Sequence, residues 1–255
     1  MPRPWLSVVV PAYNEAPSIR ASAETIAAAL EQYGRPWELI VVDNASPDGT
    51  VEAIEPLARG DDRIRVLRNE RNRGKGFSVR RGMLAAAGDL RLHCDADCAA
   101  SFVSLPALLA ELDRGADVVV GSRLARGAQL GRRQPLRRRI VGRSFVQLCR
   151  AVLREPTTDL FCGFKLWRAE AATAVYGRAQ LDGWSFDAET LALARALGFR
   201  LREVGVHWSD REGSRLSMAR VLVPVLRELA AARRHVRQEV SRAAPGSAGA
   251  PSSAG

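Results

Sequence analysis

Short apolar segments alternate with amphipathic segments through the first half of the chain. In the first amphipathic segment, apolar residues recur at helical spacing from Ile19 to Tyr33, which predicts a helix. Strands that alternate with helices form β-α-β crossovers, which build a mostly parallel sheet with helices on both faces. We therefore predict an α/β fold whose ligands bind at the carboxyl ends of the strands. The predicted strands are Leu6–Val10, Glu38–Val42, Ile64–Leu67, Leu90–Cys94 and Asp117–Gly121, and the later helices are 51–57, 77–87 and 105–112.

The second half of the chain is less regular. Segments 140–153 and 187–197 are predicted to be helical, and Gly163–Trp167 and Leu201–Trp208 to be strands. A last helix is predicted over 217–242, because apolar residues fall on one face with arginines elsewhere, and its Pro224 is expected to kink or restart it. The rest of the chain, 243–255, contains only Ala, Gly, Ser and Pro, which predicts a disordered tail.

The net charge of +10 is concentrated in one part of the chain. The sequence has 38 basic and 28 acidic residues, yet the segment Val118–Arg154 contains ten arginines and no acidic residue. Such a segment is a candidate surface for binding an anion, and the candidate anions are nucleic acid, lipid headgroups and a phosphorylated substrate. The alternative is a solvated loop in an arginine-rich chain, because Lys75 and Lys165 are the only lysines. That bias explains arginine in place of lysine but not the missing acids.

The remaining composition excludes several other classes of protein. Four cysteines without a Cys-x-x-Cys pair argue against a zinc site or a disulfide scaffold, and favour a reducing compartment. The apolar run Leu6–Ala12 is followed at once by Glu15, so no secretory signal is expected. The longest uncharged stretch, Cys98–Ala110, is shorter than the roughly 20 apolar residues that span a bilayer. We do not expect the chain to cross a membrane.

The segment Asp95-Ala96-Asp97 follows the predicted strand that ends at Cys94. Side chains two residues apart on an extended segment point the same way, so the two carboxylates form a hard oxygen site for Mg²⁺ or Mn²⁺. A surface turn is the alternative interpretation of an isolated Asp-x-Asp. Here three other turns suited to phosphate or nucleotide precede it, each at the end of a predicted strand, and this favours the metal site.

The first two of these turns carry candidate nucleotide contacts. Pro11, Tyr13 and Glu15 belong to the first, where the tyrosine is suited to stacking on a nucleobase and the carboxylate to accepting from base or ribose. The alternative there is an ordinary proline turn at a helix start. In the second turn, Asp43 is the candidate contact to base or ribose. Asp48 is either a donor-site residue or a cap of the next helix.

The third turn, Asn72–Gly76, opens a helix. Its two glycines, one of them Gly74, allow the backbone to approach a ligand closely, and Lys75 supplies positive charge. The helix N-terminus itself favours an anion. The segment lacks the spacing of a P-loop, so a glycine-rich helix entry is the alternative.

Taken together, the motifs carry a family resemblance. In chain order they are Pro-x-Tyr-Asn-Glu, Asp-Asn-x-Ser-x-Asp-Gly-Thr, Asn-Arg-Gly-Lys-Gly, Asp-Ala-Asp, Gly-Ser-Arg and Cys-Gly-Phe-Lys-Leu. The sequence from Leu6 to Leu216 resembles the family-2 inverting glycosyltransferases with the GT-A fold, and among them the polyprenyl (dolichyl) phosphate sugar transferases. This implies a GT-A catalytic domain over 1–216, followed by a basic amphipathic helix over 217–242 and the tail 243–255. It implies transfer, with inversion, of a hexose from a UDP-glucose or GDP-mannose type of donor to a polyprenyl phosphate.

The resemblance also implies roles on the donor side. The turn Asp95–Asp97 lies against the donor, with Ala96 in contact and both aspartates on Mg²⁺ or Mn²⁺, which stabilises the charge growing on the leaving diphosphate. Lys75 adds positive charge to the same group. Arg215, which follows Gly-Ser near the end of the matched region, reaches the donor diphosphate. Ala99 departs from the family pattern, which has Gln or Ser at this position, so one metal or water ligand differs.

On the acceptor side, a phosphate monoester is its own nucleophile. Its second pKa is about 6, so it arrives ionised at neutral pH and needs arginines to hold it rather than a general base. Arg123 is the family-matched catalytic candidate for this task, and the further candidates are Arg137, Arg138, Arg139 and Arg143. Asp159 is the other catalytic candidate, which orients the sugar or holds a cation. Capping, or pairing with a nearby arginine, is the alternative for Asp159.

The expected partners are a nucleotide-sugar donor, a polyprenyl-phosphate acceptor and an anionic membrane surface. The segment 132–143 and the last helix are expected to dock on lipid headgroups, unless that helix packs on the domain, and a separate membrane-protein partner also fits. We expect a cytoplasmic protein at the inner face of the membrane. The alternative is a cytosolic enzyme with a soluble phosphorylated or hydroxyl acceptor. A nucleic-acid-binding protein is the distant alternative and no nucleic acid is expected, because Phe145 is the only aromatic residue in the arginine segment.

Overall fold

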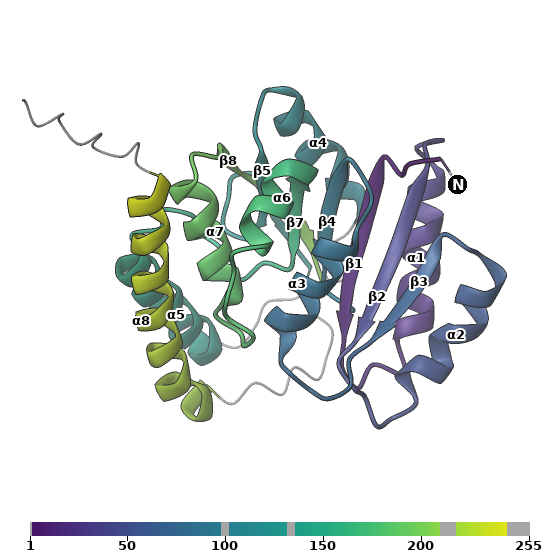
Figure 1. Ribbon diagram of the computed structural model, residues 1–255, viewed down its shortest axis with the longest axis horizontal. Helices are drawn as coiled ribbons and strands as arrows, with labels where there is room; N and C mark the ends of the chain where they lie inside the picture. The colour runs from purple at the N-terminus through teal and green to yellow at the C-terminus, as the bar shows by residue number, and fades with distance from the viewer. Residues whose placement is uncertain (1, 98–101, 132–135, 210–217, 244–255) are drawn as a thin grey trace, which may run out of the picture.

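The computed structural model describes residues 2–97, 102–131, 136–209 and 218–243, and for 136–143, 218–226 and 242–243 it describes the backbone only. A seven-stranded sheet runs through the molecule in the order β3-β2-β1-β4-β7-β5-β8 (Figure 1). Its strands are β1 (Leu6–Ala12), β2 (Trp37–Asp43), β3 (Ile64–Arg68), β4 (Leu90–Cys94), β5 (Val118–Ser122), β7 (Phe164–Arg168) and β8 (Leu201–Gly205).

Strand β7 is the exception in an otherwise parallel sheet. It runs antiparallel to both of its neighbours, β4 and β5, whereas the other described pairs in this sheet are parallel. The start of β7 therefore lies at the edge where β1 to β5 end. A separate pair of short parallel strands, β6 (Gln129–Leu130) and β9 (His207–Trp208), forms a second small sheet.

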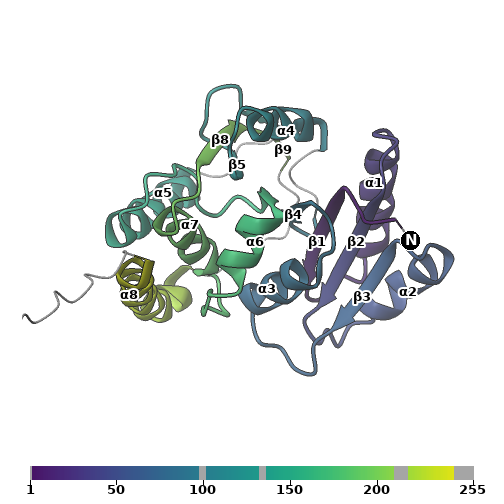
Figure 2. The same cartoon turned by 45° about the horizontal axis from the view of Figure 1, so that its top comes forward.

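Helices cover both faces of the main sheet (Figure 2). One face carries α1 (Ile19–Glu31), α2 (Thr50–Gly60), the 3-10 helix η1 (Phe102–Ser104) and α4 (Leu105–Asp113). The opposite face carries α3 (Lys75–Ala85), α6 (Ala169–Tyr176) and α7 (Phe186–Ala196), and α5 (Leu136–Leu153) and α8 (Met218–Ala243) pack beside α7. No described helix is long and apolar enough to cross a membrane.

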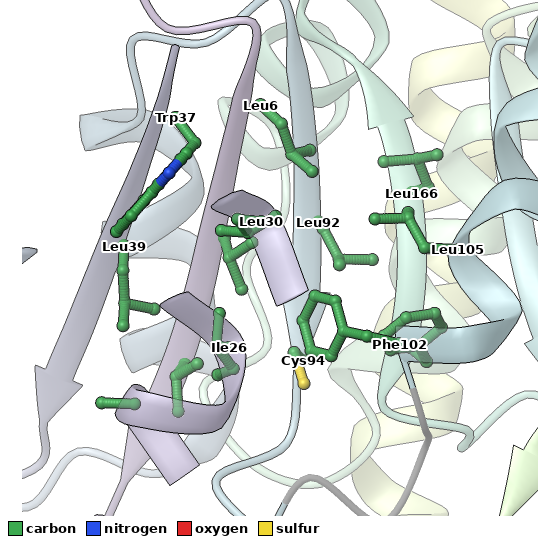
Figure 3. Packing of buried hydrophobic residues seen from close by; sticks show 14 of the residues in the cluster. Leu6, Ile26, Leu30, Trp37, Leu39, Leu92, Cys94, Phe102, Leu105 and Leu166 are labelled. Carbon is green, nitrogen blue, oxygen red and sulfur yellow. The ribbon is translucent and has the colours of Figure 1, made fainter. Parts of the chain in front are cut away.

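Two hydrophobic cores explain why the strands are apolar at consecutive positions. Val8 belongs to the same core as Ile26 and Leu30 of α1, part of which Figure 3 shows. Val9, the next residue of β1, belongs to the other core with Val79 of α3. Successive side chains of a strand point to opposite faces, so a sheet covered on both sides needs apolar residues at every position.

The structure confirms the strands and helices predicted for the first half of the chain and corrects one in the second. The prediction of a single strand over Leu201–Trp208 is wrong, because β8 ends at Gly205 and β9 pairs with β6 instead. The backbone of the 126–128 loop lies where a side chain on Gly205 would stand, and the Val206 carbonyl accepts from Gln129 N (3.1 Å), which draws the chain into the second sheet. Helix α6 and strand β6 were not predicted, and α8 runs through Pro224 without a restart.

Candidate active site

The predicted site residues that the structure describes gather at one edge of the main sheet. The turns after β1, β2, β3, β4 and β5 all lie there, because these strands are parallel. The antiparallel direction of β7 adds the loop that precedes it, which contains Asp159 and Gly163. The edge therefore combines residues from nearly two thirds of the sequence.

Lys75 and Asp95 meet at the centre of this edge. Lys75 is the first residue of α3 and Asp95 directly follows β4, and Lys75 Nζ lies 2.6 Å from Asp95 Oδ1. Burial opposes the charged form of both groups, yet the ammonium lowers the pKa of Asp95 well below its ordinary range and Asp95 raises the pKa of Lys75. The site thus has an ionised carboxylate and a permanent cation in contact.

Close backbone packing holds Asp95 in place. Its backbone N–H donates to the Gly163 carbonyl at 3.0 Å, and a Cβ added to Gly163 would overlap the Asp95 carboxylate. Gly74, whose φ is +103°, packs against the carbonyl of Asp182 in the loop before α7, where a Cβ would also overlap. Both glycines are therefore needed for the close approach of separate segments.

Trp184 extends the same edge with an aromatic surface. Its side chain is 47% exposed, and its ring centroid lies 5.4 Å from Lys75 Nζ, within reach of a cation–π contact. The structure places Trp184 at the surface, beside the cation of the site.

Asp97 lies half-buried in the turn after β4, two residues beyond Asp95. Among the described residues, no group of three or more His, Cys, Asp or Glu side chains is arranged to hold a metal by itself. The two carboxylates fit a hard divalent cation that takes its remaining ligands from water or substrate phosphates, as Mg²⁺ commonly does. Ala99, the departure from the family pattern, lies outside the described residues.

In the first turn the Tyr13 ring is exposed, whereas the Glu15 carboxylate is hydrogen-bonded within the protein. Pro11 is buried at the end of β1, and Tyr13 is 45% exposed. Glu15 Oε2 accepts a hydrogen bond from Ser18 Oγ at 2.7 Å, at the start of α1. Tyr13 is therefore accessible for stacking on a ligand, and the nucleotide contacts of all three residues stay a prediction.

The second turn is held by its own aspartates. Asp43 is fully buried and accepts from Ser46 N at 3.2 Å. Asp48 accepts from Thr50 N at 3.1 Å and from Ala16 N, in the first turn, at 3.1 Å. Asp48 thus joins two turns and accepts one backbone N–H at the start of α2, whose N-cap position is Gly49 rather than Asp48. The donor roles of Asp43 and Asp48 stay a prediction.

Arg123 and Asp159 form a bidentate ion pair beside the Lys75–Asp95 pair. Arg123 Nε and Nη2 each lie 2.7 Å from an Asp159 oxygen, and the Arg123 backbone N–H adds a third bond at 2.9 Å. Burial would raise the pKa of Asp159, but Arg123 outweighs it and holds that pKa below its ordinary range. The Trp208 ring centroid lies 4.8 Å from the guanidinium carbon. The structure thus has the arginine pairing that the sequence offered for Asp159.

Two further charged residues of the site were not predicted. Lys165, in β7, is fully buried and donates to Asp187 Oδ1 at 2.5 Å and to the Cys162 carbonyl at 2.7 Å. Glu203, in β8, accepts from the Thr158–Asp159 turn. A lone lysine inside an apolar strand was the one available sequence signal, and Glu203 gave none. The side chains of Arg137, Arg138, Arg139 and Arg143, and all of Arg215, lie outside the description.

Comparison with known proteins decides the family. The model of glycosyl transferase family 2 matches residues 7–175, about two thirds of the chain and all of the edge built from β1 to β7. The chain belongs to glycosyltransferase family 2. This membership makes it a glycosyltransferase and confirms the resemblance seen in its motifs.

Individual relatives match most of the chain. The dolichyl-phosphate beta-glucosyltransferase of Drosophila melanogaster is 35% identical over 226 residues, which are 83% of this chain and 69% of that protein. Another protein of that name, from Trichomonas vaginalis, is 33% identical over 227 residues, 84% of this chain and 67% of its own length.

A solved structure matches the fold. The glucosyl-3-phosphoglycerate synthase of Mycobacterium tuberculosis, in complex with Mn²⁺, UDP and glucosyl-3-phosphoglycerate, has a TM-score of 0.59 and 22% identity, and the match covers 96% of this chain and 82% of that one. The predicted GT-A fold is confirmed.

Proposed function

We propose that this family 2 enzyme transfers a hexosyl group, with inversion, from a nucleoside diphosphate sugar to a polyprenyl phosphate of the dolichyl type. The observation that carries the proposal is the 33% and 35% identity, over more than four fifths of the chain, to proteins named for glucosyl transfer to dolichyl phosphate. These names favour glucose over mannose as the sugar.

At the donor end, we propose that Asp95 and Asp97 hold a divalent cation, Mg²⁺ or Mn²⁺. The ionised state of Asp95 and the hard oxygen donors support this, as does the Mn²⁺ in the solved neighbour. When bound, such an ion stabilises the negative charge that grows on the leaving diphosphate. Lys75 adds its own charge there, and the exposed ring of Tyr13 is suited to the nucleobase.

At the acceptor end, we propose that Arg123 binds the lipid phosphate. The Arg123 side chain is 29% exposed, and its guanidinium is oriented by Asp159, which engages two of the five N–H donors that the group carries. Arg123 can therefore be held at one edge and bind a phosphate at another. The phosphate is ionised at neutral pH because its second pKa is about 6, so no general base has to remove a proton.

An apolar strip beside Arg123 supports a lipid acceptor. The Trp208 ring lies against the Arg123 guanidinium, and Leu130 is opposite Trp208 in the β6–β9 pairing, so both side chains share one face. Leu130 is 50% exposed, and Leu124, next to Arg123 in the chain, is 48% exposed. In a prenyl phosphate the apolar chain is attached directly to the phosphate. A cation that lies beside exposed apolar side chains can therefore bind both parts of the molecule.

A matched pair of variants tests the lipid contact. Leu130→Ser is expected to raise the KM for a long-chain polyprenyl phosphate several-fold and to leave the KM for a ten-carbon prenyl phosphate unchanged. A several-fold change corresponds to partial loss of one leucine contact. Leu84→Ser is the control, because Leu84 is similarly exposed (46%) but lies on α3. Equal effects on both chain lengths would count against the strip as a lipid contact.

A soluble phosphorylated acceptor is the second candidate. It is favoured by the solved neighbour, whose bound product is glucosyl-3-phosphoglycerate. Arg123 suits either kind of phosphate, and the apolar strip at Leu130 and Trp208 favours the lipid. Transfer to water-soluble phosphates with none to prenyl phosphates would decide for this candidate.

We further propose that the enzyme works at the inner face of a membrane and docks on anionic lipid. Helix α8 packs on the domain through Leu229 and Ala232, and its other side exposes Arg227, Arg234 and Arg237. Basic side chains near an anionic surface contribute about 1 kcal/mol each. Co-sedimentation with anionic liposomes at low salt is expected, together with its loss when the three arginines become glutamate. If the enzyme docks on a membrane protein instead of on lipid, it will not bind protein-free liposomes.

The deciding experiment is a donor panel with a short polyprenyl phosphate and Mg²⁺ or Mn²⁺. We expect one nucleotide sugar to give prenyl-phosphate hexose, and Asp97→Ala to abolish it. Transfer that persists undiminished in chelator and in Asp97→Ala would refute the metal role. Failure of every donor with every prenyl phosphate would refute the acceptor class.

A further inference from the structure

We propose that Glu203 is a positioning residue that holds Arg123 and Asp159 in place for the transfer reaction. The inference rests on the proposed acceptor role of Arg123. Glu203 lies in the middle of β8, directly opposite Val120 of β5 in the sheet. It therefore projects from a strand next to β5, which ends at Ser122, one residue before Arg123, and nothing in its sequence context indicates a function.

One oxygen of Glu203 fixes the turn that carries Asp159. Glu203 Oε1 accepts from Thr158 N at 2.9 Å, from Thr158 Oγ1 at 2.8 Å and from Asp159 N at 3.2 Å. Three donors on one acceptor define the position of the Thr158–Asp159 peptide. The Asp159 side chain can then reach Arg123 with both of its oxygens.

The same hydrogen-bonded chain reaches the turn that carries Arg123. The Thr158 hydroxyl donates to Glu203, so in its 3.3 Å contact with Ser122 Oγ it is the serine that donates. Ser122 Oγ in turn accepts from Leu124 N at 3.2 Å and Ala125 N at 3.1 Å. Glu203 thus anchors both partners of the ion pair, one directly and the other through two hydroxyl groups.

Position, rather than charge, is the contribution that this geometry assigns to Glu203. All three of its donors are neutral, and the charge of Arg123 is already met by Asp159. A glutamine side-chain oxygen can accept the same hydrogen bonds, whereas alanine cannot. Misplacement of a reacting group by about 1 Å can lower the rate about 100-fold.

The test compares Glu203→Gln, Glu203→Ala and a control that loosens the sheet elsewhere. Asp117→Ala is that control, because Asp117 Oδ2 accepts from Arg200 N at 2.8 Å and ties β5 to β8 at the opposite end of both strands. We expect Glu203→Ala to lower kcat about 10- to 100-fold with an unchanged donor KM. Glu203→Gln is expected to stay within about threefold of wild type, and Asp117→Ala to keep its kcat.

Amide hydrogen exchange gives a readout that needs no turnover. The amides of Thr158 and Asp159 are expected to exchange at least about tenfold faster in Glu203→Ala, with wild-type rates in Glu203→Gln and Asp117→Ala. The proposal is overturned if Glu203→Ala keeps both its exchange rates and its kcat, or if Glu203→Gln loses as much as Glu203→Ala. Wild-type protein that transfers no sugar to prenyl phosphate would refute the acceptor assignment instead, and the exchange rates would still test the positioning.

Discussion

The buried Lys165–Asp187 ion pair provides the sharpest test of the structure. The two side chains are 0% and 4% exposed, and Lys165 Nζ also donates to the Cys162 carbonyl. Lys165→Met keeps most of the side-chain volume but leaves the Asp187 carboxylate buried without its ammonium partner. Breaking a buried pair in this way costs about 3–5 kcal/mol. At about 2–4 °C per kcal/mol for a chain of this size, the melting temperature falls by about 6–20 °C.

A double-mutant cycle separates the pair from its surroundings. Asp187→Leu alone leaves the ammonium buried and is expected to cost as much as Lys165→Met. The double variant K165M/D187L removes both charges and leaves the Cys162 carbonyl without its lysine donor, which costs about 1–3 kcal/mol. The double variant is therefore expected to be more stable than either single variant, with a coupling energy of about 3 kcal/mol or more.

Urea unfolding followed by far-UV circular dichroism measures these differences. The matched control is the Arg20–Glu24 pair on α1, whose 2.9 Å contact is similar but whose side chains are 58% and 49% exposed. Loss of that pair is expected to cost at most about 1 kcal/mol. The reasoning is refuted if Lys165→Met costs less than about 1 kcal/mol, or if the double variant is no more stable than the single ones.

Three further predictions concern the site itself. Gly163→Ala forces the Asp95 carboxylate aside and should lower transfer about 100-fold in a turnover assay, whereas Gly60→Ala, with nothing within 4 Å of the added carbon, should not. Asp159→Asn removes a stabilisation that is fully present above the unfolded pKa of about 3.9 and is lost as pH falls through the lower folded pKa. The difference in urea unfolding midpoint between wild type and this variant should therefore be equal at pH 8 and pH 6 and should shrink below about pH 4. A difference that widens in acid contradicts this reasoning. Burial raises the pKa of Cys162 to about 12, so about one thiol in 10⁴ is ionised at pH 8, and mass spectrometry should find iodoacetamide on it only after denaturation.

Much of the fold follows from local patterns in the sequence. The consecutive apolar residues of β1 indicate a strand buried on both faces, and the helical spacing from Ile19 onward indicates the helix beside it. The direction of β7 does not follow, because it depends on the path of the chain through α5 rather than on residues of the strand. Strand β6 has two residues, Gln129 and Leu130, too few to form any period.

The candidate site divides in the same way. The meeting of Lys75 and Asp95 is expected once parallel strands are inferred, because Lys75 follows the turn after β3 and Asp95 directly follows β4, and both strands end at the same edge. The pairing of Arg123 with Asp159 requires the antiparallel β7, which the sequence does not reveal. Glu203 is an ordinary strand residue in sequence, and its role arises only from its place beside β5. Sequence patterns therefore miss the contacts between residues that are distant in the sequence and that only the order of the strands in the sheet brings together.

The two cations proposed to meet phosphate are each already paired with a carboxylate, and the two pairs differ in what they permit. Lys75 carries a compact ammonium with three N–H donors on a flexible stem, so a diphosphate can bind it while Asp95 keeps one of those donors. Arg123 offers a planar group with donors on more than one edge, so Asp159 can orient it while a phosphate binds elsewhere on the same side chain. Both cations can therefore add a phosphate to an existing pair, but two side-chain hydrogen bonds hold the Arg123 guanidinium in one orientation, whereas a single contact joins Lys75 to Asp95. Hydrogen bonds to Glu203 of β8 secure the turn of Asp159, whereas Asp95 is held by its own N–H donating to the Gly163 carbonyl, by the close packing at Gly163, and by His93 Nε2, 3.5 Å from its Oδ1.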